Sequence, residues 1–198
     1  MPLRLLRYQD LPITPWKNGG GVTREILSAQ DDGEGVNFLW RVSIATISAS
    51  GPFSRFDNVD RTIAVLSGNG IRLSHPAGMI ELTTPTPPHP FAGETSIYAD
   101  LIKGETTDLN AMSLRHRFHQ KMQMHLVSSE MTIRTTDDKS VLVFGGPMTV
   151  SHQGEHLDVA AFDALADLMS GSIVGLNASH PTPCYVITFR PVGVQRSE

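Results

Sequence analysis

The chain has 198 residues, with 16 Lys and Arg against 20 Asp and Glu, which gives a formal net charge of −4. No basic block or Arg-rich tail is present, so nucleic acid is not expected as a partner. No apolar run approaches the length of a membrane span, and the charged start MPLRLLRYQD is too short for a signal peptide, so no membrane association is expected. The single cysteine, Cys184, allows no internal disulfide and fits a reducing cytoplasm, where we expect the protein.

The elements predicted along the chain are nearly all β-strands. Runs rich in β-branched and aromatic residues, separated by turn residues at short spacing, are typical of a sandwich or barrel. They cover residues 38–47, 62–73 with a hairpin signal at 67–70, 79–82, 96–102, 108–114, 122–127, 131–135, 140–146 and 184–189. The proline-rich segment 83–90 is expected to be a stiff loop between strands. One window, residues 157–169, follows helical periodicity and predicts a short capping or crossover helix.

The segment WKNGGGVTRE, residues 16–25, has an unusual composition for a loop. Three consecutive glycines allow the backbone to adopt positive φ and to approach a neighbour or a ligand closely. Lys17, Asn18 and Arg24 surround these glycines with hydrogen-bond donors, as does the indole of Trp16. A tight turn into a strand explains the glycines as well as a ligand-binding loop does, so both interpretations stay open on this segment alone.

Six segments give the most specific signal in the sequence: WKNGGGVTREI, FLWRVSIATISASGPFSRF, DRTIAVLSGNG, DLNAMSLR, SVLVFGG and YVITFRP. Together, and in this order, they resemble the HutD/Ves family of cupin-fold proteins over most of the chain. The resemblance implies a bicupin, with two antiparallel β-barrels of the RmlC-like cupin type. It also implies an association with bacterial histidine utilisation, in which the protein would bind a small pathway acid such as formylglutamate or urocanate.

No sharp linker divides the chain, and the weaker break is the polar cluster RHRFHQK at residues 115–121. We place a soft boundary there. The expected domains are an N-terminal cupin barrel at residues 1–118 and a smaller C-terminal barrel at residues 119–198, with exchange of strands between them allowed for.

Metal binding and nucleophilic catalysis lack their usual residues. Cupin metal sites generally use a His-x-His pair, because residues i and i+2 lie on the same face of a strand. None of the eight histidines forms such a pair. No Gly-x-Ser-x-Gly elbow and no P-loop is present either. We therefore expect no metal, no cofactor and no catalytic residue, and the sequence favours binding while leaving open whether a reaction is catalysed.

Polar side chains on otherwise apolar strand faces form the candidate site. Strand alternation places Arg41 with Ser43, and Arg61 with two β-branched residues that follow it. Asn110 shares a face with Asp108 and Met112, and Arg24 shares one with Val22 and Ile26. A charge on an apolar face is costly unless it is paired or used, and arginine can hold a carboxylate through two parallel hydrogen bonds.

Two interpretations of these arginines remain. Each could instead point outward, or pair with Asp57, Asp60, Asp100 or Asp108. For the set together we favour a pocket in the mouth of a barrel, since small barrels can hold one small ligand. The predicted ligand-binding residues are Lys17, Asn18, Arg24, Arg41, Arg61 and Asn110. The cations would capture a carboxylate, and the two asparagines would recognise an amide or formyl group.

The resulting hypothesis is a regulatory protein of bacterial histidine catabolism that binds a small carboxylate metabolite, formylglutamate or urocanate, without metal. One alternative is a metal-independent cupin enzyme, an isomerase or hydrolase that acts on a small acid. A second alternative is a protein-interaction scaffold. The oligomeric state is left open, with a homodimer as one assembly to test.

Overall fold

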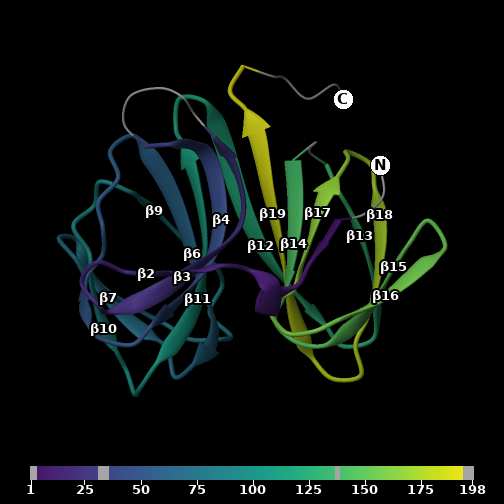
Figure 1. Cartoon of the computed structure of the whole chain (residues 1–198), viewed down its shortest axis with the longest axis horizontal. Coiled ribbons are helices and arrows are strands. Elements are labelled where there is room, and N and C mark those ends of the chain that lie inside the picture. The colour runs from purple at the N-terminus through teal and green to yellow at the C-terminus, as the bar shows by residue number, and fades with distance from the viewer. Residues whose placement is uncertain (1–3, 31–35, 137–138, 194–198) are drawn as a thin grey trace. The chain divides into compact units, whose positions relative to one another are not determined.

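The structure is a computed structural model that describes residues 4–30, 36–136 and 139–193. Apart from one short 3-10 helix, η1 (Tyr8–Asp10), its regular elements are all β-strands, so the all-β prediction is confirmed (Figure 1). The chain divides into two compact units, Pro12–Phe118 and Met1–Leu11 together with His119–Glu198. Within the described ranges, no helix is long and apolar enough to cross a membrane.

The Pro12–Phe118 unit contains two sheets. The six-stranded sheet has the order β2-β3-β4-β11-β6-β9, and the four-stranded sheet has the order β5-β10-β7-β8. The six strands are β2 (Ile13–Pro15), β3 (Gly21–Gln30), β4 (Phe38–Ile47), β11 (Thr106–Leu114), β6 (Val59–Gly68) and β9 (His89–Ala92). The four are β5 (Gly51–Pro52), β10 (Tyr98–Leu101), β7 (Ile71–His75) and β8 (Gly78–Leu82).

Strands β4, β11 and β6 form the centre of the six-stranded sheet and are largely buried. The β-branched and aromatic residues of β4 and the β-branched residues of β6 suit this position. An apolar cluster that includes Ile63, Val65 and Ile71 fills part of the space between the two sheets. The pairing of β11 with β6 shifts register between Thr107 and Asp108, which marks a β-bulge. Such bulges re-aim side chains, and this one lies next to the polar residues described below.

Two of the three glycines at the start of β3, Gly19 and Gly21, are required by local geometry. Gly19 has φ of +70°, a conformation that glycine adopts without strain. A Cβ added at Gly21 would lie 2.5 Å from the backbone oxygen of Thr46 and 3.1 Å from the Trp16 ring. A Cβ at Gly20 would meet only the Asn18 side chain, at 3.4 Å and beyond. The segment is therefore a tight turn that brings Trp16 and β3 into close contact.

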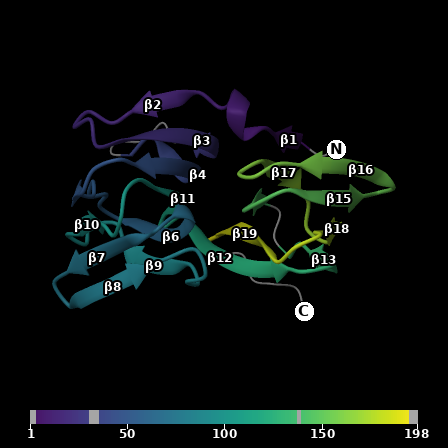
Figure 2. The same ribbon diagram turned by 90° about the horizontal axis from the view of Figure 1, so that it is seen from below.

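The second unit also contains two sheets, with the orders β1-β17-β14-β19-β12 and β13-β18-β15-β16. The first comprises β1 (Arg4–Leu6), β17 (Ala164–Leu168), β14 (Lys139–Phe144), β19 (Thr182–Pro191) and β12 (Phe118–Val127). The second comprises β13 (Glu130–Arg134), β18 (Ile173–Asn177), β15 (Met148–His152) and β16 (Glu155–Val159). Figure 2 shows the N-terminal strand β1 beside β17, with which it pairs in antiparallel register.

The predicted helix at residues 157–169 is wrong, because this segment forms the end of β16, a turn and β17. The turn places Phe162 at φ of +71°, which interrupts any helix. The side chain of Asp163 accepts hydrogen bonds from the backbone N–H of Ala160 (2.9 Å) and of Tyr8 (2.9 Å), and from Arg7 (2.7 Å). These side-chain contacts offer the backbone an alternative to the helix.

The strands of the described residues form four open sheets, and no sheet closes into a barrel. The two-barrel part of the fold prediction is therefore not established by the strand pairing.

Candidate ligand-binding site

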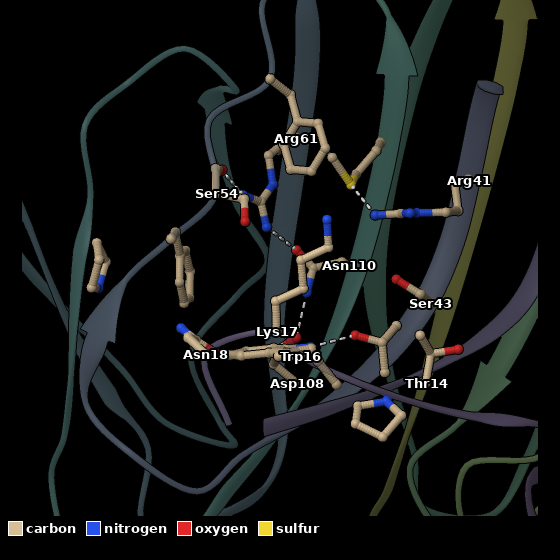
Figure 3. Close-up of a pocket in the computed structure, with 17 residues that line it drawn as sticks. Thr14, Trp16, Lys17, Asn18, Arg41, Ser43, Ser54, Arg61, Asp108 and Asn110 are labelled. Carbon is tan, nitrogen blue, oxygen red and sulfur yellow. Dashed lines mark hydrogen bonds between the residues drawn. The ribbon is translucent and has the colours of Figure 1, made fainter. Parts of the chain in front are cut away.

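A cavity of about 580 Å³ lies within the Pro12–Phe118 unit (Figure 3). This volume falls in the range of small-molecule pockets, which is roughly 300–1,000 Å³. Its lining comes from the β2–β3 segment, from β4, β6 and β11, and from the chain between β5 and β6. The residues are Thr14, Pro15, Trp16, Lys17, Asn18, Thr23, Arg41, Ser43, Ala45, Pro52, Phe53, Ser54, Phe56, Arg61, Asp108, Asn110 and Met112.

The polar floor of the cavity is set by the register of three neighbouring strands. Met112 of β11 pairs with Arg41 of β4 on one side and with Arg61 of β6 on the other. Asn110 and Asp108 follow at two-residue steps along β11, so alternation places them on the same face as Met112. The pairing of strands distant in sequence thus brings two arginines, an amide and a carboxyl group into one cavity.

The β2–β3 turn forms one edge of the cavity. The Trp16 indole N–H donates to the Thr23 hydroxyl at 2.7 Å, and this bond fixes the ring that contacts Gly21. The side-chain oxygen of Asn18 accepts from the Gly20 backbone N–H at 3.0 Å, which leaves the amide nitrogen of Asn18 as its free donor group. Lys17 is exposed and adds a positive charge at the cavity.

Arg61 is a buried cation with an aromatic surround. Its Nη2 donates to Oδ1 of Asn110 at 2.8 Å, and its Nη1 donates to the backbone oxygen of Ser54 at 3.3 Å. The guanidinium carbon lies 5.4 Å from the Phe53 ring centroid, 5.6 Å from that of Phe56 and 4.9 Å from that of Phe91. Burial lowers the pKa of Arg61 to about 10, so the side chain is still cationic at neutral pH.

Arg41 has even fewer acceptors. Its Nη2 donates to the sulfur of Met112 at 3.2 Å, a weak acceptor, and its guanidinium lies 4.9 Å from the Phe38 ring centroid. The Nε groups of Arg41 and Arg61 are both buried, and neither has a hydrogen-bond partner. Burial lowers the pKa of Arg41, and the negative charge of Glu25 opposes that shift. The two guanidinium groups therefore keep unmatched donors beside one cavity.

Asp108 is the carboxyl group of the cavity, and it is only 1% exposed. Its Oδ1 accepts a short hydrogen bond from Nδ2 of Asn110. Burial raises the pKa of Asp108 to about 7, although the nearby charge of Arg61 and the Asn110 bond act in the opposite direction. Near neutral pH this carboxyl group is thus present in both protonation states.

Five of the six predicted binding residues line the cavity: Lys17, Asn18, Arg41, Arg61 and Asn110. Arg24 does not. Its neighbour Thr23 faces the cavity, and alternation along β3 turns Arg24 to the opposite face. Whether the five residues bind a ligand stays a prediction.

Sequence reasoning missed the aromatic side chains around Arg61 and the contact of Arg61 with the Ser54 carbonyl. Phe53, Ser54 and Phe56 belong to an irregular segment between β5 and β6, where no periodic pattern predicts the direction of a side chain. These three residues belong to the motif GPFSRF, which is part of a segment that resembles the HutD/Ves family. That resemblance is the signal in the sequence that points to them.

A structural ion pair with one of the predicted aspartates is found at a different arginine. Arg115 donates to Asp60 at 2.6 Å and to Glu94 at 2.8 Å, so Asp60 is a partner of Arg115. Among the ion pairs of the described residues, none includes Arg41 or Arg61. In the same part of the chain, no three His, Cys, Asp or Glu side chains gather in a way that could hold a metal ion.

Comparison with known proteins places the chain in context. A family model described as HutD matches residues 8–178. An uncharacterised 21.2 kDa protein in the hutC 3′ region of Pseudomonas putida is 42% identical over 122 residues. That match spans 61% of this chain and 63% of the relative, which is less than two thirds of its length. Protein Ves of Citrobacter koseri is 33% identical over 137 residues, which are 69% of each chain.

The chain is also similar to proteins whose structures have been solved. HutD from Pseudomonas fluorescens SBW25, in a formate condition, matches with a TM-score of 0.78 at 30% identity and covers 96% of this chain and 100% of that one. A salicylate 1,2-dioxygenase from Pseudoaminobacter salicylatoxidans matches with a TM-score of 0.61 at 7% identity, over 98% of this chain and 86% of that one. At this identity the likeness shows the fold alone, which is a cupin-like β fold.

Proposed function

Because the chain belongs to the HutD family, we propose that it is a small-carboxylate-binding regulatory protein of bacterial histidine catabolism. The cavity of the Pro12–Phe118 unit is its binding site, and the ligand is formylglutamate or urocanate, held without metal. The relatives connect the family with histidine utilisation, since one of them is encoded in a hutC 3′ region. We also propose a two-barrel arrangement, a cytoplasmic location and a homodimer.

The observation that carries this proposal is the state of the two cavity arginines. Arg61 is buried and Arg41 is half-buried, both line one cavity, and each keeps a buried Nε–H without a partner. A native structure rarely leaves buried charged donors unmatched, because each one costs free energy. A ligand carboxylate would supply the missing acceptors and the missing negative charge.

The charge balance favours an anion. Lys17, Arg41 and Arg61 face the cavity with one carboxyl group, Asp108, whose protonation varies near neutral pH. The cavity therefore carries a net charge of about +2 or +3, depending on that proton. Formylglutamate has two carboxylates and urocanate has one, so both are attracted by this field.

The test is calorimetry of both acids on the wild type and on Arg61 variants. Arg61→Ala should weaken binding by about 2–5 kcal/mol, because the ligand charge is then left buried without its partner. Arg61→Lys should also weaken binding, since lysine lacks the bidentate fork. The matched control is Arg72→Ala on β7 of the same unit, whose side chain is exposed and pairs with Glu81 at 3.2 Å. This variant should bind like the wild type.

The outcomes separate the alternatives. Circular dichroism checks that each variant is folded, and NMR of the mixture checks whether the acid is consumed. Binding without consumption supports the proposed regulatory binder, whereas turnover of the acid would support the enzyme alternative. Absence of binding by both acids to the wild type would reject the proposal and leave the scaffold alternative. Unchanged affinity in Arg61→Ala would place the ligand outside this cavity.

A further inference from the structure

The cavity face of the central strands is an ordered grid of side chains. Arg41, Met112 and Arg61 occupy one row across the sheet, and Asn110 and Asp108 lie in the next two rows along β11. Side chains two residues apart on a strand are separated by roughly 7 Å. The guanidinium of Arg61 reaches the Asn110 side chain at 2.8 Å, so the cation lies about one row from Asp108.

Asn110 is held in one orientation by its two neighbours. Its oxygen accepts from Arg61, and its nitrogen donates to Asp108. A flipped amide would place a donor against a cation and an acceptor against a carboxylate, so this orientation is enforced by the network. Asn110 therefore positions Arg61 and Asp108 relative to each other, and the amide is less available to a ligand than the sequence suggested.

Asp108 differs in chemistry from every other charged group at the cavity. The charged side chains that face it are Lys17 from the β2–β3 turn, Arg41 from β4 and Arg61 from β6, all of them cations. Asp108 is the single carboxyl group among the lining residues, and its hydrogen bond with Asn110 engages Oδ1. An ionised carboxylate has acceptor capacity on both oxygens and no donor. A second ligand carboxylate near it would be repelled, whereas a ligand N–H would be bound.

On the basis of the proposed function, we propose that Asp108 is a specificity-determining residue that selects carboxylate ligands with a neutral N–H donor. The ligand carboxylate binds Arg41 and Arg61, and the ligand N–H donates to Asp108. Asn110 lies between these two contacts along β11. A ligand that carries a carboxylate but no such donor binds only when Asp108 takes up a proton from solvent. An ammonium group is disfavoured as the donor, because three cations face the same cavity.

The proposal predicts different proton counts for two ligands. Because the carboxyl group of free Asp108 is half protonated near pH 7, at pH 8 it is mostly ionised. Glutarate, which has no N–H, should then bind with uptake of close to one proton per molecule. N-formylglutamate, which adds an amide N–H to the same five-carbon diacid, should bind with uptake close to zero. The affinity for glutarate should fall about tenfold per pH unit above 7.

Isothermal titration calorimetry at pH 8, in buffers of different ionisation enthalpy, measures these counts on the wild-type protein. Asp108→Asn is the near-isosteric variant. It should bind glutarate without proton uptake and with an affinity independent of pH. The same variant should bind N-formylglutamate at least tenfold more weakly, because the new amide presents a donor to the ligand N–H. Asp100→Asn on β10, outside the cavity lining, is the matched control and should behave like the wild type.

The results distinguish the two proposals. If the wild type binds both acids with the same proton count, and Asp108→Asn changes both affinities equally, Asp108 does not select the donor while the cavity still binds carboxylates. If the wild type binds neither of these acids and does not bind urocanate either, the proposed function fails and this inference fails with it. The proton counts come from the wild type, so the test does not depend on the folding of a variant.

Discussion

Between its two sheets, the unit that contains residues 119–198 packs aliphatic and aromatic side chains, among them Leu142, Phe144 and Val186. The Pro12–Phe118 unit also contains two sheets, yet its central strands β6 and β11 direct Arg61 and Asp108 into a cavity. Apolar packing stabilises the folded state by removing apolar surface from water. Turning charged side chains inward instead costs free energy, because these groups lose their contact with water. Such a penalty is typical of residues that serve a function, and on this ground we place the proposed binding site at this cavity.

The largest change in stability is expected in the unit that contains residues 119–198. It tests whether buried apolar side chains stabilise that unit. Phe144 on β14 is fully buried in the apolar cluster, so Phe144→Ala should lower the free energy of unfolding by about 3–5 kcal/mol. Urea denaturation measures the loss. Ile173→Ala on β18, where the side chain is 49% exposed, is the control and should change stability by less than about 0.5 kcal/mol. Equal losses in both variants would show that this unit has no dominant apolar core.

In the Pro12–Phe118 unit, the cost of burying Asp108 should appear as a dependence of the free energy of unfolding on pH. The pKa of Asp108 rises from 3.8 in the unfolded chain to about 7 in the fold, so the folded state holds the proton more tightly. Stability should therefore fall as pH rises from 4 to 7, by up to about 4 kcal/mol. Asp108→Asn removes this term, so its curve should be flatter than that of the wild type. Parallel curves from urea denaturation at several pH values would contradict the assignment.

The smallest effect tests the turn at the edge of the cavity. Gly21→Ala should destabilise the fold by about 1–3 kcal/mol, because the added Cβ would overlap the Thr46 oxygen and the Trp16 ring. Gly20→Ala is the neighbouring control, with only the Asn18 side chain in contact distance, and it should be tolerated. Thermal unfolding compares the two variants. Similar melting temperatures would mean that the close approach at Gly21 relaxes freely.

Local pattern predicted much of the strand content and the faces of individual strands. The alternation of β4 placed Arg41 with Ser43, and that of β11 placed Asn110 with Asp108, as the structure shows. These predictions succeed because side-chain direction in a strand depends only on the period of two.

What the sequence could not provide is the pairing of distant strands. Arg41 and Arg61 reach one cavity because β4 and β6 both pair with β11, and no local pattern encodes that register. The wrong helix at residues 157–169 has the same origin, since the contacts that stabilise the turn come from Arg7 and Tyr8, more than 150 residues away. Long-range hydrogen bonds override local periodicity there.

The most direct test of the central claim, that the polar cavity holds a carboxylate, is an NMR titration of the arginine side-chain Nε–H groups. With formylglutamate or urocanate added, the signals of Arg41 and Arg61 should shift and saturate together, because their unmatched donors gain an acceptor. The signals of Arg72 and Arg115, which already have carboxylate partners, should stay in place. Saturable binding that leaves Arg41 and Arg61 unchanged would contradict the account.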